Sequence, residues 1–159
     1  MTLLQWLKGW HLDSLKINAY FLEAELNFQA ADRSAAWEMY IELLTRITTQ
    51  PLSDNDGDEK SALNSVYSLF ATTREIIKRN GPGCLNFTKI AIVILNQIVR
   101  PFTARWHRVS LTNGFDIPEN RILFRNELAD LQTVLHHYSG LLSKVAGVED
   151  LTDLETIKD

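Results

Sequence analysis

The 159-residue sequence contains a single cysteine, Cys84, so no disulfide bond can form within the chain. It also lacks a long apolar run, because its most apolar stretch, Ile90–Leu95, is far shorter than the roughly 18–20 apolar residues that span a membrane. The N-terminal residues lack the basic region and small-residue cleavage site of a signal peptide. These absences predict a cytoplasmic chain that folds without disulfides and has no membrane segment.

Signatures of metal binding and catalysis are equally sparse. Four histidines are present, but none pairs with a second histidine or a glutamate at the helical spacings of known metal sites. The acidic loop Asp54–Glu59 has Leu52 and Leu63 where an EF-hand needs its first and last oxygen ligands. We therefore expect no metal and no cofactor, and the sequence favours a protein that is not an enzyme. Asp58 is predicted to cap the helix after this loop.

Charge is distributed unevenly, although the net charge is only −4. Residues 71–115 hold seven lysines and arginines but one acid. Residues 1–70 hold five basic and ten acidic residues, and residues 116–159 hold four and nine. The acidic flanks argue against strong non-specific binding to nucleic acid, whereas a local basic patch can still bind phosphate groups.

Apolar residues recur at helical spacing, which predicts an all-α single domain over residues 1–159 with five to six helices. The clearest stripe belongs to a long C-terminal helix that starts near Pro118 and stops at Gly147. Its members are Phe124, Leu128, Leu131, Leu135, Tyr138, Leu142 and Val145. Such a stripe suits either a core face or a coiled-coil seam, so a homo-oligomer is an open alternative.

Polar capping residues, glycine and proline mark the predicted helix boundaries in the first half of the chain. A helix over Leu12–Ala30 is followed by a second helix with Asp32 or Ser34 as its N-cap. Pro51 is expected to terminate that second helix, and the turn Asn80–Gly83 is expected to end the third.

The fourth predicted helix, Leu85–Val99, is apolar on nearly every side at Ile90–Leu95. A helix of that kind belongs in the middle of a bundle, so we expect it to be central. Pro101 is expected to end or kink it and to begin a short further helix. Cys84, just before it, is expected to be a small buried residue; a reactive thiol at a helix start is the alternative.

The segment Arg100–Arg108 combines a phosphate-binding side chain with a titratable one. Six residues separate Arg100 from His107. This spacing resembles the arginine–histidine motif of HEPN-family ribonucleases, which are compact all-helical domains of about this size. The resemblance implies metal-independent RNA cleavage at a dimer interface, with His107 in acid–base chemistry and Arg100 holding the phosphate.

Partner contacts are the function that the sequence favours over catalysis. We expect an accessory or regulatory helical module that binds a protein partner, with a nucleic-acid-binding module as a further alternative. The predicted contact residues are Arg74, Lys78, Arg79, Arg105, Arg108, Trp6 and Trp10. The two tryptophans belong to a short amphipathic helix over residues 1–11, which has too few basic residues for a membrane surface. Residues 148–159 form a predicted acidic tail.

Overall fold

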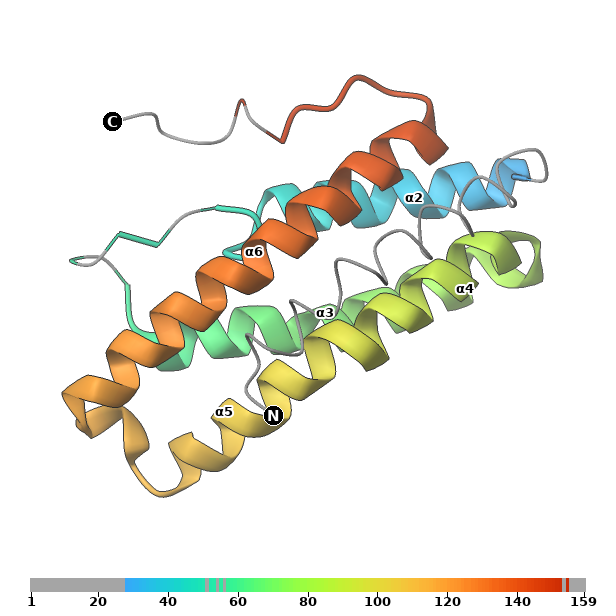
Figure 1. Ribbon diagram of the computed structural model, residues 1–159. Helices are drawn as coiled ribbons and strands as arrows, with labels where there is room; N and C mark the ends of the chain where they lie inside the picture. Colours follow the sequence, from blue (N-terminus) through green and yellow to red (C-terminus); the bar gives the residue numbers. More distant parts are fainter. Residues whose placement is uncertain (1–27, 51, 54, 56, 153, 155–159) are drawn as a thin grey trace.

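The computed structural model describes residues 28–50, 52–53, 55, 57–152 and 154 (Figure 1). No strand occurs among these residues, and helices dominate, which confirms the predicted all-α class. The α-helices are α2 (Ala30–Leu44), α3 (Glu59–Asn80), α4 (Leu85–Ile94), α5 (Arg100–Leu111) and α6 (Pro118–Ala146). Two predicted helices, the short one over residues 1–11 with Trp6 and Trp10 and the one over Leu12–Ala30, lie wholly or almost wholly outside the described residues.

Counted as unbroken runs of helical backbone, the described chain has three helices rather than the expected five to six. α2 and α6 are two of these runs, and the third extends from Glu59 to Leu111 and contains α3, α4 and α5. The predicted break after α3 is a 3-10 turn, Gly81–Cys84, rather than a loop. Gly81 has a φ of 73°, a backbone conformation that glycine adopts readily, and the chain reverses direction there (Figure 1).

The short further helix predicted from Pro101 is present as α5, which begins at Arg100 and ends at Leu111, but the helical backbone is not broken before it. A π-helical turn, Leu95–Val99, joins α4 to α5, and the N–H of Arg100 donates to the carbonyl of Leu95. Proline inside a helix removes one donor and crowds the preceding turn, and a π turn is one of the irregularities that helices adopt at such points. Arg100 therefore lies within a continuous helix.

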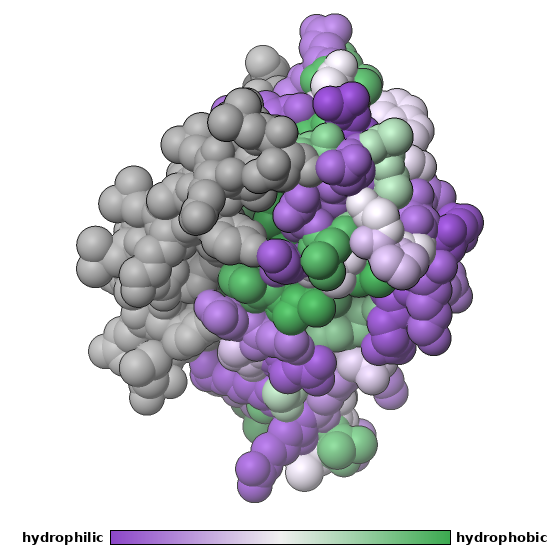
Figure 2. All heavy atoms as spheres, turned by 90° about the vertical axis from the view of Figure 1, so that its right-hand side faces the viewer, coloured by the Kyte–Doolittle hydropathy of each residue, from purple (hydrophilic) through white to green (hydrophobic). Residues whose placement is uncertain are grey.

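Among the described helices, α4 lies at the edge and not at the centre, contrary to the prediction from Ile90–Leu95. Ile90, Ala91 and Ile94 are buried, whereas Ile92 is 49% exposed. Figure 2, a view onto the end where α3 turns into α4, shows apolar side chains exposed between hydrophilic areas. A helix that is apolar on nearly every side thus uses only one side for the core.

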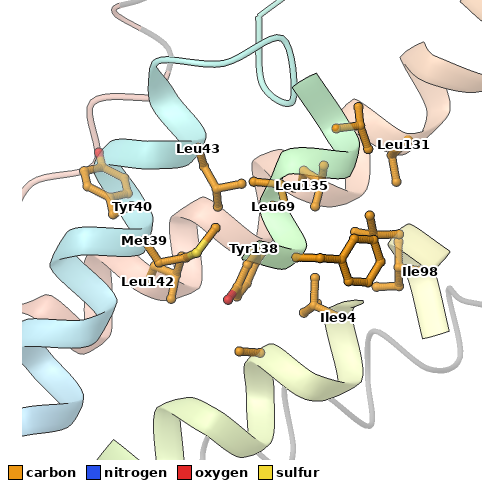
Figure 3. Packing of buried hydrophobic residues seen from close by; sticks show 14 of the residues in the cluster. Met39, Tyr40, Leu43, Leu69, Ile94, Ile98, Leu131, Leu135, Tyr138 and Leu142 are labelled. Atoms are coloured by element: carbon orange, nitrogen blue, oxygen red, sulfur yellow. The ribbon is translucent and has the colours of Figure 1, made fainter. Parts of the chain in front are cut away.

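The core lies where α6 packs against α2, with α3 and the end of α4 beneath (Figure 3). Every residue of the predicted α6 stripe is buried, which confirms it as a core face. Leu135, Tyr138 and Leu142 of α6 meet Met39 and Leu43 of α2. Full burial of such a side chain contributes about 1.5–3 kcal/mol, so this stripe is a main source of stability.

The ends of α6 are as predicted. Pro118 is its first residue, and Gly147 follows its last residue in a left-handed conformation with φ 72°. Gly140, inside the helix, allows a close approach, because a Cβ there would lie 3.3 Å from a carboxylate oxygen of Asp150. The close neighbour is therefore the segment after α6.

α2 begins about one turn earlier than predicted, with Gln29 as its N-cap in place of Asp32 or Ser34. Asp32 is fully buried, and its carboxylate accepts hydrogen bonds from the N–H groups of Gln29 and Phe87, both at 2.8 Å. Phe87 belongs to the first turn of α4. One carboxylate therefore satisfies backbone donors at the N-termini of two helices.

α2 also ends earlier than predicted, at Leu44 rather than at Pro51. The hydroxyl groups of Thr48 and Thr49 both donate to the carbonyl of Leu43, at 3.1 and 2.7 Å. Threonine side chains here take the place of further backbone donors, and this local competition ends the helix before the proline is reached.

Asp58 caps α3 as predicted. Its carboxylate accepts a hydrogen bond from the Ser61 N–H at 2.8 Å and from the Ser61 hydroxyl at 2.7 Å. These hydrogen bonds lower the pKa of Asp58, because they favour its ionised form.

Candidate functional site

Arg100 and His107, the two residues of the HEPN-like spacing, both contact α3 from α5. The Arg100 guanidinium carbon lies 4.7 Å from the centroid of the Phe70 ring. The His107 and Tyr67 rings meet edge to face, with 4.8 Å between their centroids. The contacts run in opposite order along the two helices, as they do in an antiparallel pair. Arg100 and His107 therefore line one seam between α3 and α5.

Arg100 and His107 do not converge on one point within this seam. The Nε and Nη2 atoms of Arg100 each donate to the Oδ1 atom of Asn96, at 3.1 Å, one turn toward α4. Seven residues correspond to about 10.5 Å along a helix, and the Arg100 side chain extends away from His107. One chain thus offers two separate contacts to a ligand rather than a single two-residue site.

Tyr67 is the residue of this seam that the sequence analysis missed. It is 53% exposed, although the ring of His107 contacts it and the centroid of the Phe70 ring lies 5.6 Å away. The signal in the sequence is its place on α3, because Tyr67 lies beside the buried stripe that includes Val66 and Phe70. Its neighbours hold the ring in position while leaving much of its surface open.

Four basic side chains around the seam have no carboxylate partner among the residues that the structure describes. They are Arg74 and Lys78 on α3 and Arg100 and Arg108 on α5, and all four are exposed. Their positive charge is therefore available to a negatively charged ligand, because no ion pair within the described residues neutralises it.

Helical spacing explains why these residues share a surface. Tyr67, Arg74 and Lys78 follow intervals of seven and four residues, so they lie along one side of α3. On α5, Arg108 is eight residues after Arg100 and about 80° further round the helix, at the margin of the seam. We call the surface made of Tyr67, Arg74, Lys78, Arg100, His107 and Arg108 the basic face.

Two other predicted contact residues, Arg79 and Arg105, form ion pairs inside the molecule. A terminal nitrogen of Arg79 lies 2.8 Å from a carboxylate oxygen of Glu38 on α2. A terminal nitrogen of Arg105 lies 2.5 Å from a carboxylate oxygen of Glu127 on α6. These two pairs attach α3 to α2 and α5 to α6, so the structure separates Arg79 and Arg105 from the arginines of the basic face.

Glu127 links the core to the orientation of α5. Its second carboxylate oxygen accepts a hydrogen bond from the Trp106 indole N–H at 2.7 Å. Burial raises the pKa of the Glu127 carboxyl, and the Trp106 hydrogen bond and the charge of Arg105 act in the opposite direction. Trp106 and Phe102 are buried, as predicted. With Trp106 held inward, the side of α5 that carries Arg100 and His107 meets α3.

Two other kinds of site considered in the sequence, a reactive cysteine and a metal site, lie outside the basic face or are not formed. Cys84 is buried, and its thiol donates to the carbonyl of Gly81 at 3.2 Å, as expected of a structural cysteine. Within the described part of the chain, no group of three His, Cys, Asp or Glu side chains is arranged to hold a metal ion.

One stretch within Glu59–Leu111 is long and apolar enough to cross a membrane, judged by length and composition alone. Core helices of soluble proteins also pass this test.

The chain matches no family model, no curated protein and no solved structure. The HEPN-like resemblance therefore rests on Arg100 and His107 alone. The charges, contacts and exposure of the basic face are the observations from which a function is argued.

Proposed function

We propose that this chain is a helical interaction module, an accessory or regulatory protein that works through partner contacts at the basic face. The observation that carries the proposal is the group of four exposed cations without a carboxylate partner in the described residues, which lie on the same two helices that border the exposed ring of Tyr67. Isolated surface charges contribute little to folding. Arginine and tyrosine are, in contrast, among the side chains that contribute most to binding at interfaces.

The partner that fits this surface is negatively charged where it meets the chain. Arginine binds carboxylate and phosphate groups through two parallel hydrogen bonds, and lysine adds a point charge. Tyr67 adds an exposed aromatic ring to this charged surface. Complementary charge also raises the rate of association, so complex formation is expected to weaken as salt concentration rises.

The test compares complexes recovered from the native source at low salt with the unaltered chain and with Arg74→Glu/Arg108→Glu. We expect the double variant to lose its stoichiometric partner. Arg33→Glu/Lys144→Glu makes the same charge change at exposed positions of α2 and α6, and it is the matched control that should keep the partner. A partner retained equally by both variants would show that the basic face is not the contact surface.

Trp6 and Trp10 are predicted contacts of a separate kind, at the start of the chain. Removal of residues 1–11 tests them independently of the charge variants. If this truncation releases the partner while Arg74→Glu/Arg108→Glu retains it, the contact surface lies at the N-terminal segment instead.

A HEPN-like ribonuclease is the second candidate, because Arg100 and His107 line the same seam. They are about 10.5 Å apart along α5, so a single phosphate is best reached by Arg100 of one copy and His107 of another. A dimer interface is what the family resemblance implies. RNA cleavage in the presence of a chelator tests this candidate. His107→Ala should abolish cleavage and leave the fold intact, and equal cleavage by both proteins would exclude the ribonuclease.

A further inference from the structure

We propose that the ligand of the basic face is a single-stranded nucleic acid and that Tyr67 is the platform on which one of its bases stacks. The inference rests on the proposed function and deepens it, because it names the chemical class of the anionic partner. It is argued from one exposed ring and the line of cations beside it.

Tyr67 has the properties of a stacking platform. Half of its surface is open, while the rings of His107 and Phe70 contact it from within the seam. The hydroxyl of Tyr67 has no hydrogen-bond partner among the described residues, so its polar end is not engaged in holding the fold together. Aromatic side chains of this kind stack on any nucleobase, because every base presents a flat π face.

Three of the four cations lie in a line that leads away from Tyr67 along the seam, and Arg108, next to His107, lies at the other end of it. Arg100 stands over Phe70, three residues beyond Tyr67 on α3. Arg74 and Lys78 follow at about 10 and 17 Å from Tyr67 along the helix axis. A row of positive charges beside an aromatic ring matches a strand whose backbone carries one phosphate per nucleotide.

Arg100 is oriented before any ligand arrives. Two hydrogen bonds to Asn96 and the contact with the Phe70 ring hold its guanidinium group in one place. A pre-organised group loses less conformational entropy on binding than a free side chain. The guanidinium group also has donors left over, because only two of its five N–H bonds face Asn96.

A single strand fits better than an acidic protein or a duplex. An acidic helix would satisfy the cations but would bring no flat ring to Tyr67, and a duplex keeps its bases stacked within itself. The surrounding sequence is locally basic, with seven lysines and arginines and one acid over residues 71–115. Because the contacts join cations to phosphates, binding is expected to depend strongly on salt, and the acidic flanks confine it to the basic face.

The experiment measures fluorescence anisotropy of labelled oligouridine and oligothymidine of about 15 nucleotides, and of a duplex of equal length, at several salt concentrations. We expect the single strands to bind more tightly than the duplex. The logarithm of the affinity should fall with the logarithm of salt concentration with a slope of about −3, since four cations contribute about 0.7 each.

Variants of single residues separate stacking from charge. Tyr67→Ala should weaken binding about tenfold or more, whereas Tyr67→Phe should bind like the unaltered chain. Arg74→Gln should reduce the salt slope by about 0.7. Arg79→Gln is its matched control, because Arg79 is already paired with Glu38, and it should leave the slope unchanged. Thermal unfolding of each variant confirms that the fold is retained.

Three results would overturn the inference: no oligonucleotide binding at low salt, a duplex that binds as tightly as the single strand, or full affinity in Tyr67→Ala. If no oligonucleotide binds but Arg74→Glu/Arg108→Glu still releases a protein partner, the nucleic-acid ligand is excluded and the proposed function stands. If neither oligonucleotides nor a partner respond to that double variant, both proposals are excluded.

Discussion

Two tyrosines show how differently the two sides of this molecule use polar and aromatic groups. Tyr40, on α2, is fully buried, and its hydroxyl donates to Asp150 at 3.2 Å and accepts from the Leu151 N–H. Tyr67, on α3, is 53% exposed, and its hydroxyl has no hydrogen-bond partner among the described residues. The first tyrosine holds the fold together, and the second is available for a partner.

The same contrast extends to the residues around Tyr40. Residues 148–152 of the predicted acidic tail pack back onto the helices, so this part of the tail is not free. The Thr152 hydroxyl donates to Asp150 at 2.5 Å and lies 2.9 Å from the Ser139 hydroxyl of α6. Burial raises the pKa of Tyr40, so its hydroxyl stays protonated and continues to donate at neutral pH.

Charged residues also fall into two groups, buried ones that are paired within the fold and exposed ones on the basic face. Glu59, Glu127 and Asp32 are buried carboxylates that each have partners within the fold. Glu59 pairs with an arginine, Glu127 with an arginine and an indole, and Asp32 with two backbone donors. Arg74 and Lys78, on the basic face, are exposed without a carboxylate partner in the described residues. Buried polar groups must be satisfied inside the fold, whereas exposed ones carry no such requirement. This difference predicts which substitutions affect stability and which affect binding.

The largest expected effect is on the buried side, at Asp32. Asp32→Ala leaves the N–H groups of Gln29 and Phe87 without their acceptor, so the free energy of unfolding should fall by about 2–4 kcal/mol. Urea denaturation measures the loss. Asp32→Asn, which keeps the shape and one acceptor oxygen, should lose less. A loss below about 0.5 kcal/mol for Asp32→Ala would mean that the double cap is not needed.

The pair of tyrosines gives the next largest effect. Tyr40→Phe removes one hydroxyl from the network with Asp150 and Leu151, and it should lower the free energy of unfolding by about 1–2 kcal/mol. Hydrogen exchange at the Leu151 amide should become faster, which mass spectrometry can detect. Tyr67→Phe is the matched control and should change neither quantity. Equal effects of the two variants would contradict the comparison between the two sides.

Asp58 provides a smaller effect that depends on pH. Asp58→Ala removes the cap of α3 and should cost about 0.5–1 kcal/mol at neutral pH. Because the folded pKa of Asp58 is lowered, its stabilisation is present above its unfolded pKa, near 3.8, and is lost as pH falls through the folded value. Urea denaturation of both proteins should therefore show a difference that shrinks in acid. A difference independent of pH would mean that the ionised carboxylate is not the capping form.

The smallest expected effect on stability belongs to the basic face. Arg74→Gln and Lys78→Gln should each change the free energy of unfolding by less than about 0.5 kcal/mol, because neither side chain has an ion-pair partner in the described residues. Thermal denaturation of the two variants checks this. A loss above about 1 kcal/mol would assign these cations to the fold rather than to a partner.

Local patterns predicted much of the fold and part of the site. The spacing of apolar residues identified α6 and its buried face, and Pro118, Gly147 and Asp58 marked helix ends correctly. The same patterns misplaced α4, because an apolar run shows that a helix can be buried but not how many of its sides are covered. For the basic face, the cations were visible in the sequence, but their separation into paired and unpaired groups was not.

The sequence by itself determined the helical class, the face of α6 that is buried and the presence of a basic middle segment, since these depend on residues within a few turns of one another. Only the tertiary structure decided that Asp32 caps α4 across 55 residues and that Glu127 holds Trp106 and Arg105. It also decided that Arg100 and His107 meet α3. Such contacts join distant parts of the chain, so they follow from which helix faces pack together, and no local spacing specifies that choice.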